Sequence, residues 1–186
     1  MAPVTALAGP TVIVLASGRG ARFTASGGST HKLQALLAGK TVLAHTLAAV
    51  RASGLPWHLE DAGHPGMGDS IAAAVQATFQ QGPQSAGWLI LPADLPLIQS
   101  DTLRAVAQAL AVHDVVLPLY QGQRGHPVGF SARCGPALLG LKGSAGAAAV
   151  VKAHAAFELT VEDVGCITDI DTLVDLQAAA RHLRFS

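Results

Sequence analysis

A continuous run of apolar, mostly β-branched residues at positions 11–16 constrains the fold of this chain more than any other feature. Such a run is typical of a strand buried on both faces of a parallel sheet, because a strand with one solvated face alternates apolar and polar side chains. Further strands are predicted at 57–60, 87–91, 114–117, 127–130 and 157–161. We expect Pro92 and Pro118 to end two of them, since proline cannot donate a hydrogen bond to a sheet.

Segments with helical spacing separate the predicted strands. In residues 41–53 apolar side chains recur every three or four positions, and Gly54 follows as a helix stop. Further helices are predicted at 69–80, 101–112, 136–141, 145–154 and 172–181, three of them capped by Gly68 or Asp69, by Ser100 and by Asp171. The alternation predicts a doubly wound α/β fold with a mostly parallel sheet and helices on both faces, in a single domain spanning residues 1–186.

Charge and cysteine content exclude several classes of partner. Of the residues, 50% are apolar and 13% are charged, with 12 basic and 12 acidic side chains, so we expect neither nucleic acid nor an anionic membrane as a partner. The uncharged N-terminal stretch lacks a basic region and contains Pro3 and Pro10, which argues against a signal peptide or a membrane span and for a cytoplasmic protein. Cys134 and Cys166 lack metal-ligand spacing, and we expect two idle thiols.

Loops that directly follow strands carry the ligand sites of such a sheet. Residues 18–31 are rich in glycine and are expected to be loop throughout; they carry Arg19 and Arg22, and Lys32 follows. Glycine amides approach phosphate oxygens closely and the cations neutralise their charge, so the segment predicts a phosphate site, with an ordinary surface loop as the alternative. Neither the Walker pattern nor the dinucleotide fingerprint is present, which disfavours a P-loop ATPase and a Rossmann dehydrogenase.

A second candidate residue, Asp94, follows the predicted strand at 87–91 and lies between Pro92 and Pro96. A rigidly held carboxylate suits Mg²⁺, which takes one or two carboxylates besides phosphate oxygens and water. The alternative for a lone aspartate is a helix cap or a turn former. The phosphate site predicted nearby favours the metal ligand, because a triphosphate site needs a metal.

Five segments, taken in order, resemble those of one family. They are residues 12–22 with Lys32, the Gly-Met-Gly-Asp-Ser-Ile at 66–71, the Leu-Pro-Ala-Asp-Leu-Pro at 91–96, the Arg-Gly-His-Pro-Val at 124–128 and the Asp-Ile-Asp-Thr at 169–172. The first is similar to the Leu-Ala-Ala/Gly-Gly-x-x-x-Arg…Lys signature of the MobA-like nucleotidyltransferases. The set as a whole, which covers nearly the whole chain, most resembles the molybdenum-cofactor cytidylyltransferase branch.

This resemblance implies a magnesium-dependent transfer of a nucleoside monophosphate to a molybdopterin-like phosphorylated acceptor, with release of pyrophosphate and with CTP favoured over GTP. It implies that Arg22, Lys32 and Asp94 are catalytic, with Asp94 as the metal ligand. Because such a transfer depends on positioning and charge stabilisation, few residues need to react covalently. The implied nucleotide site consists of Leu15, Ala16, Ser17, Gly18, Arg19, Gly20 and Ser70, and the implied acceptor site of His126 and Pro127.

The eight histidines differ in the roles expected of them. For His126, a role in turn geometry between Gly125 and Pro127 is the alternative to an acceptor contact. The others lack ligand spacing and are expected to be surface or packing residues, with His31 as an exception to watch because it precedes Lys32.

Two departures from the family pattern affect these expectations. Ser144 stands where the family's Gly-Asp-x-Gly-Ala segment has an aspartate that resembles a second acidic contributor to the metal site, so Asp169 or Asp171 would have to compensate. Residues 55–66 leave room for one strand, where family members fit a strand, a helix and another strand. We therefore expect a sheet trimmed at one edge, with a second copy of the chain or a client molybdoenzyme as the protein partner.

Two other functions stay open at this point. One is a non-catalytic nucleotide- or cofactor-binding accessory protein for a molybdenum hydroxylase, which Ser144 and the short edge favour. The other is a sugar- or polyol-phosphate nucleotidyltransferase, against which the segment at 124–128 favours the cofactor branch.

Overall fold

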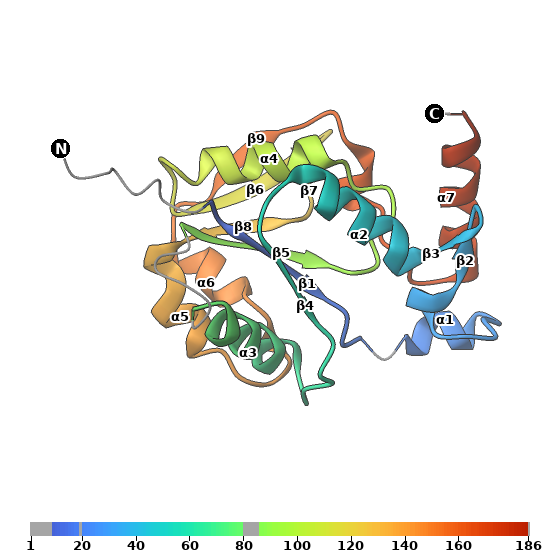
Figure 1. Ribbon diagram of the computed structural model, residues 1–186, viewed down its shortest axis with the longest axis horizontal. Helices are drawn as coiled ribbons and strands as arrows, with labels where there is room; N and C mark the ends of the chain where they lie inside the picture. The colour runs from blue at the N-terminus through green and yellow to red at the C-terminus, as the bar shows by residue number, and fades with distance from the viewer. Residues whose placement is uncertain (1–8, 19, 80–85, 186) are drawn as a thin grey trace.

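A seven-stranded sheet forms the centre of the computed structural model, which describes residues 9–18, 20–79 and 86–185 (Figure 1). The strand order is β4-β1-β5-β8-β6-β7, and β9 pairs with β6. Pairing is parallel from β4 through β1 to β5 and between β6 and β9, while β8 runs antiparallel between β5 and β6. The strands are β1 (Thr11–Leu15), β4 (Trp57–Glu60), β5 (Gly87–Pro92), β6 (Val115–Tyr120), β7 (Gln123–Arg124), β8 (Val128–Ser131) and β9 (Phe157–Thr160).

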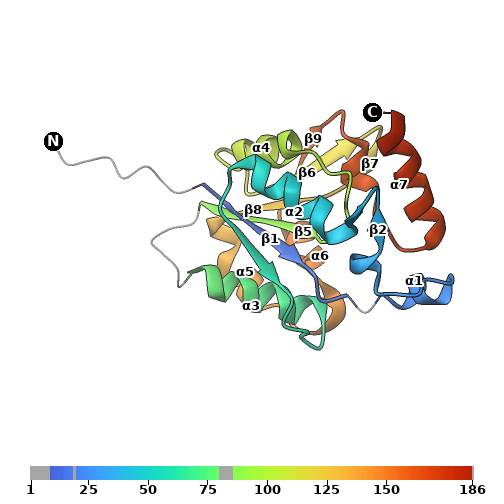
Figure 2. The same cartoon turned by 45° about the vertical axis from the view of Figure 1, so that its right-hand side comes forward.

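Helices cover both faces of this sheet, as Figures 1 and 2 show. One face carries α2 (Val42–Ser53) and α4 (Ser100–Ala109), and the other carries α3 (Met67–Phe79), α5 (Gly135–Leu139) and α6 (Ala148–Ala153). The short α1 (Ala21–Ala25) and the C-terminal α7 (Leu173–Phe185) lie to one side, with the hairpin of β2 (Leu36–Leu37) and β3 (Lys40–Thr41). The predicted doubly wound α/β fold is confirmed.

The continuous apolar run explains how β1 holds the two layers together. Val12 and Val14 point to the cluster that contains the apolar face of α2, whereas Ile13 points to the cluster that contains Ile71 of α3. All three strand residues are fully buried. Burying each such side chain contributes roughly 1.5–3 kcal/mol, so both faces of β1 stabilise the fold.

The glycine-rich segment differs from its prediction, because α1 lies inside the range expected to be loop. Gly20 has a φ of 63°, a left-handed conformation that suits glycine, and the helix begins directly after it. Phe23 is buried and anchors this single turn, and Gly28 donates its amide to the Phe23 carbonyl. The burial of Phe23 stabilises a helix in a segment whose glycine content predicts a loop.

The two strands that contain Pro92 and Pro118 extend further than predicted. Pro92 is the last residue of β5, and β6 continues through Pro118 to Tyr120. The carbonyl of Pro118 accepts from the amide of Gly125, so the strand retains its pairing although the proline ring has no N–H to donate.

Several predicted caps lie elsewhere. Helix α3 begins at Met67, ahead of Gly68 and Asp69, and α4 includes Ser100 as its first residue. The amides ahead of α7 donate to Asp175 rather than to Asp171. The predicted helix at 145–154 begins only at Ala148, because Gly146 adopts a φ of 51° and a 3₁₀ turn (η3, Gly143–Ala145) precedes it. The predicted end of α3 at Gln80 lies outside the described residues.

The short segment after α2 forms β4 alone, as expected, and β4 is the edge strand of the sheet. Cys134 and Cys166 are buried free thiols, as predicted, and burial raises the pKa of Cys166 to about 11. Among the described residues, no helix has the length and apolar character needed to cross a bilayer.

Candidate active site

A cleft of about 1010 Å³ opens at the carboxyl ends of the parallel strands, where the predicted loops meet. It is lined by Leu15 at the end of β1, by Ser17 and Gly18 in the loop that follows, and by Lys32, Asp94 and Asp171 from three further segments. The apolar wall on the other side comes from β5, β8, α3 and α6, and includes Ile71, Ile90, Val128, Phe130 and Val151. The cleft therefore combines a charged end with an apolar wall.

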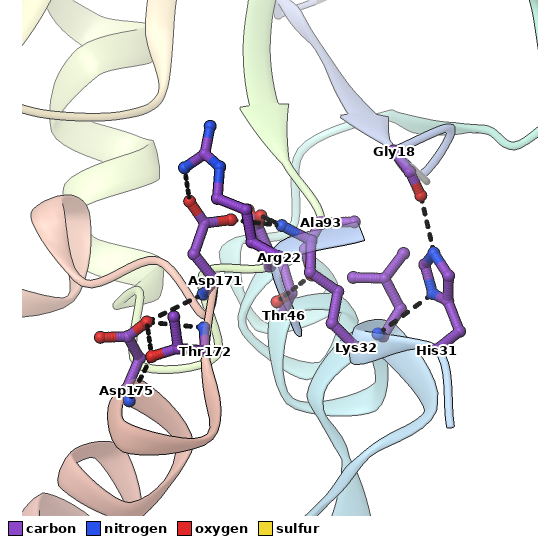
Figure 3. Close-up of polar contacts among 11 residues, drawn as sticks. Gly18, Arg22, His31, Lys32, Thr46, Ala93, Asp171, Thr172 and Asp175 are labelled. Carbon is purple, nitrogen blue, oxygen red and sulfur yellow. Dashed lines mark hydrogen bonds and ion pairs between the residues drawn. The ribbon is translucent and has the colours of Figure 1, made fainter. Parts of the chain in front are cut away.

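The loop after β1 is held by side chains from two other elements. Ser17 Oγ lies 3.0 Å from Ser70 Oγ on α3, and the Gly18 carbonyl lies 2.7 Å from His31 Nε2 (Figure 3). Because the Leu33 amide donates to His31 Nδ1, the proton of a neutral His31 is on Nε2 and is donated to Gly18. His31 thus acts on the loop rather than facing the cleft as a ligand.

Lys32 lies at the centre of the charged end of the cleft. It begins the 3₁₀ turn η1 (Lys32–Gln34), and its Nζ donates to Asp94 Oδ2 at 2.6 Å and to Asp171 Oδ1 at 2.8 Å. Only 12% of its side chain is exposed. Burial opposes the ammonium, but the hydrogen bonds and charges of Asp171 and Asp94 outweigh that effect and raise the pKa of Lys32. Lys32 is therefore charged at neutral pH.

The loop that carries Asp94 is fixed on three sides by its backbone. The Ala93 amide donates to the Leu15 carbonyl, the Ala93 carbonyl accepts from Thr46 Oγ1 on α2, and the Asp94 carbonyl accepts from the Ile170 amide. The side chain, in contrast, is only half satisfied: Oδ2 accepts from Lys32, and the buried Oδ1 has no hydrogen-bond partner within the described part of the chain. A buried carboxylate oxygen without a partner is costly unless a ligand takes it, and a hard cation does so.

Asp171 is predicted both as a helix cap and as one of two acidic residues that would compensate for Ser144. It does not cap the helix, and its carboxylate accepts from Lys32 Nζ and from the guanidinium of Arg22 (Figure 3). The hydrogen bond from Lys32 and the nearby positive charges of Lys32 and Arg22 lower the pKa of Asp171. The Asp-Ile-Asp-Thr segment was the available signal, since the bond from the Ile170 amide to the Asp94 carbonyl brings Asp171 beside the β5 loop.

The predicted site residues occupy different places relative to the cleft. Arg22 is held by Asp171 but is 79% exposed, and Ser70 is buried and touches Ser17 rather than lining the cleft. Ala16 and Gly20 are not among the lining residues of the cleft, and Arg19 lies outside the described residues.

The wall predicted to border an acceptor is built on a close backbone approach. Gly125 packs so tightly on Cys166 that a Cβ there would lie 2.5 Å from its carbonyl oxygen, and the His126 amide donates to the same carbonyl. His126 lines the cleft, and its Nδ1 is buried without a partner among the described residues. Burial lowers its pKa, although Asp94 and Asp169 act in the opposite direction, so the imidazole is neutral at pH 7. Pro127 is buried beside it, outside the cleft lining.

The Gly-Met-Gly segment has a clear packing reason. A Cβ on Gly66 would lie 2.3 Å from the backbone of Gly143, and one on Gly68 would lie 2.9 Å from the Lys142 carbonyl. The Gly143 amide donates to Asp69, so the η3 turn is fixed against the start of α3. Ser144 therefore lines the cleft at a fixed place, without the charge of an aspartate.

The capacity to hold a metal rests on oxygen donors. Asp94 and Asp171 converge on one cation, Lys32 Nζ, and Asp94 Oδ1 is a free buried acceptor. Carboxylate oxygens are the donors that Mg²⁺ and Mn²⁺ take, and substrate oxygens and water complete their coordination shells. In the described part of the chain, no three His, Cys, Asp or Glu side chains are grouped so as to hold a metal ion.

Comparison with known proteins agrees with this geometry. The family model for the MobA-like NTP transferase domain matches residues 47–157. The purine catabolism protein PucB of Bacillus subtilis is 34% identical over 110 residues, which cover 58% of this chain and 52% of PucB. The match thus spans about half the length of that curated relative.

Solved structures share the whole fold. Rv0371c of Mycobacterium tuberculosis superposes with a TM-score of 0.77 at 22% identity, covering 95% of this chain and 99% of that one, and has also been solved in complex with manganese. Molybdopterin-guanine dinucleotide biosynthesis protein A of Archaeoglobus fulgidus superposes with a TM-score of 0.66 at 15% identity, covering 95% and 100%. At these identities the similarity establishes the fold alone.

Proposed function

Because this chain belongs to the MobA-like NTP transferase domain family, we propose that it transfers a nucleoside monophosphate, from CTP in preference to GTP, to a molybdopterin-like phosphorylated acceptor. The membership confirms the family and the enzyme class, a nucleotidyltransferase, expected from the sequence motifs. The observation that carries the proposal is Asp94, a residue of the cleft lining whose carboxylate accepts from Lys32 with one oxygen, while its other oxygen is buried and has no hydrogen-bond partner among the described residues. One domain, residues 1–186, contains the whole proposed site.

The charged end of the cleft is the place for the triphosphate. The loop at Ser17 and Gly18 offers backbone at close range, and Lys32 and Arg22 supply two cations within reach of one carboxylate, Asp171. These cations neutralise the charge that develops as pyrophosphate leaves, while the fixed loop positions the α-phosphate for attack by the acceptor. Leu15, Ala16, Gly20, Arg19 and Ser70 complete the proposed nucleotide site.

Asp94 would hold the divalent metal, and Asp171 would be its acidic companion, because both carboxylates contact Lys32 Nζ. When bound, Mg²⁺ neutralises phosphate charge and polarises the reacting phosphoryl group. The manganese complex of Rv0371c supports a divalent metal in this fold. Asp171 thereby supplies the second carboxylate that Ser144 does not provide, which favours turnover over a purely accessory role.

The apolar wall and His126 form the proposed acceptor side. A neutral His126 can hydrogen-bond an acceptor without adding charge, and Pro127 fixes the backbone beside it. The A. fulgidus neighbour is named for molybdopterin-guanine dinucleotide biosynthesis, and the Arg-Gly-His-Pro-Val segment at 124–128 resembles the cofactor branch; both support a molybdopterin-like acceptor. The edge strand β4 is the proposed surface for a second copy or a client molybdoenzyme.

Pyrophosphate release tests the proposal. The purified chain is incubated with CTP, GTP, ATP or UTP, with Mg²⁺ and either a molybdopterin-type cofactor or a polyol phosphate. We expect release with CTP and the cofactor, and none without metal. If pyrophosphate is released only with the polyol phosphate, the chain is a polyol-phosphate nucleotidyltransferase instead. If no pair releases pyrophosphate and no nucleotide binds, the proposed function is wrong.

Ser144 offers a sharper arm of the same assay. Ser144→Asp adds a carboxylate at the cleft, and we expect it to tighten metal binding and to raise turnover at low metal concentration. Ser144→Asn, a matched variant without the charge, should leave both unchanged.

A further inference from the structure

Lys32 occupies the space between two carboxylates that a bound metal would need. Its Nζ lies 2.6 Å from Asp94 Oδ2 and 2.8 Å from Asp171 Oδ1, and its side chain is 12% exposed. An ammonium at these distances is a monovalent substitute for a metal ion at the same pair of oxygens. Lys32 is also the cation that the proposed function assigns to the triphosphate, so one side chain has two competing sites.

We propose that Lys32 and the divalent metal compete for Asp94 and Asp171, and that the triphosphate opens the metal site by drawing Lys32 onto its phosphates. The inference rests on the proposed function and specifies the order of binding: the nucleotide, alone or with its metal, precedes tight metal binding by the protein.

The contacts of the four carboxylate oxygens support this competition. Asp94 Oδ2 and Asp171 Oδ1 accept from Lys32, and Asp171 Oδ2 pairs with Arg22, which leaves Asp94 Oδ1 as the single oxygen without a partner in the described chain. A hard cation with one protein ligand binds weakly, because Mg²⁺ and Mn²⁺ then depend on substrate oxygens and water. Ligation by both aspartates requires the ammonium to leave.

Lys32 and Arg22 differ in which aspartates they contact and in how far they are exposed to solvent. Lys32 contacts both aspartates from a buried position, whereas Arg22 contacts Asp171 alone and is 79% exposed, so solvent screens its charge. Lys152 also lines the cleft and is exposed, with no hydrogen bond or ion pair to either aspartate in the structure. Arg22 and Lys152 therefore serve as controls for Lys32, because removing either one also removes a positive charge near the cleft.

The test is Mn²⁺ binding by electron paramagnetic resonance, which needs no turnover. Without nucleotide, we expect Lys32→Met to bind Mn²⁺ roughly tenfold or more tightly than the wild type, the size of a charged hydrogen-bond contact. Arg22→Met should tighten binding less, and Lys152→Met should leave it unchanged. Equal tightening by all three variants, or none by Lys32→Met, would overturn the proposal.

A second measurement uses the intact side chain, in case Lys32→Met disturbs folding. In protein whose lysines carry ¹³C at Cε, saturating Mg²⁺ together with a non-hydrolysable CTP analogue should shift the Lys32 resonance far more than the same Mg²⁺ alone. An unmoved Lys32 signal would overturn the inference. Absence of CTP binding would count against the proposed function instead, while the nucleotide-free Mn²⁺ titration still decides the competition.

Discussion

Asp94 and Asp163, which follow the carboxyl ends of β5 and β9, differ in how many hydrogen bonds their carboxylate oxygens accept. Asp163 is 2% exposed, and its carboxylate accepts from the amides of Gln99 and Gly165 and from the Thr102 hydroxyl, at 2.6 to 2.9 Å. Asp94 is 15% exposed, yet it accepts from Lys32 alone and leaves Oδ1 unpaired. Both follow a strand within a few residues, so the sequence context alone does not separate them.

The difference lies in what each carboxylate holds in place. Asp163 joins the loop after β9 to the first turn of α4, where a Cβ on Gly165 would lie 2.0 Å from the Leu97 carbonyl. Its donors belong to the protein, so it is complete without a ligand. Asp94 has its backbone fixed and its side chain incomplete, which is the condition expected of a residue that completes its contacts with a ligand.

Replacing Asp94 should have the largest effect. Asp94→Asn keeps the shape but removes the negative charge from the proposed metal ligand, and we expect pyrophosphate release to fall by roughly a hundredfold or more. The melting temperature should change little, because the wild-type carboxylate is itself half satisfied. Asp101→Asn, on the surface of α4, is the control and should retain full activity. An active Asp94→Asn enzyme would place the metal elsewhere.

Asp163 should show the opposite profile. Asp163→Ala removes the acceptor of the Gln99 amide, of the buried Gly165 amide and of the buried Thr102 hydroxyl, so we expect the free energy of unfolding to fall by about 2–3 kcal/mol. Chemical denaturation measures this loss, with the exposed Asp61→Ala as the control. CTP affinity of the folded variant should be unchanged; a loss of affinity at full stability would mean that Asp163 also belongs to the site.

The smallest expected effect is on the pKa of His126, which should respond to replacement of Asp94 but not to replacement of Asp163. Burial lowers this pKa from 6.5 in the folded state, and the charge of Asp94 partly opposes the shift. Removing that charge destabilises the imidazolium, so Asp94→Asn should lower the pKa further, whereas Asp163→Ala should leave it unchanged. An NMR titration of the imidazole from pH 7.5 to 4.5 measures both. Because the unfolded state binds this proton first, His126 also reduces stability as the pH falls below 6.5.

Much of the fold follows from the sequence because its signals are local. The two-sided burial of Val12, Ile13 and Val14 and the helix stop at Gly54, which adopts a φ of 72°, both depend on short segments. Helix α1 escaped prediction because its stability depends on burying Phe23, a tertiary contact. The strand ends at Pro92 and Pro118 were placed early because a proline disrupts a strand only where its missing N–H is needed.

The site shows the same division. Lys32 and Asp94 come from separate motifs, and their position after a strand indicates that they meet. Asp171 was predicted as a possible acidic companion of the site and also as a helix cap, because aspartate before a helix usually caps it. Asp175, one turn later, takes the Asp171 and Thr172 amides and leaves the Asp171 carboxylate to Lys32 and Arg22. Competition between two aspartates for one cap depends on side-chain geometry that a single sequence does not contain.

Under the proposed competition, Asp94 and Asp171 hold a divalent metal once a nucleotide has drawn Lys32 away. Anomalous scattering from crystals grown with Mn²⁺ and a non-hydrolysable CTP analogue would locate the metal and Lys32 together. We expect one manganese peak within coordination distance of Asp94 and Asp171, with Lys32 Nζ on the phosphates. A manganese ion bound away from both aspartates, or Lys32 still between them in the nucleotide complex, would contradict the proposed competition.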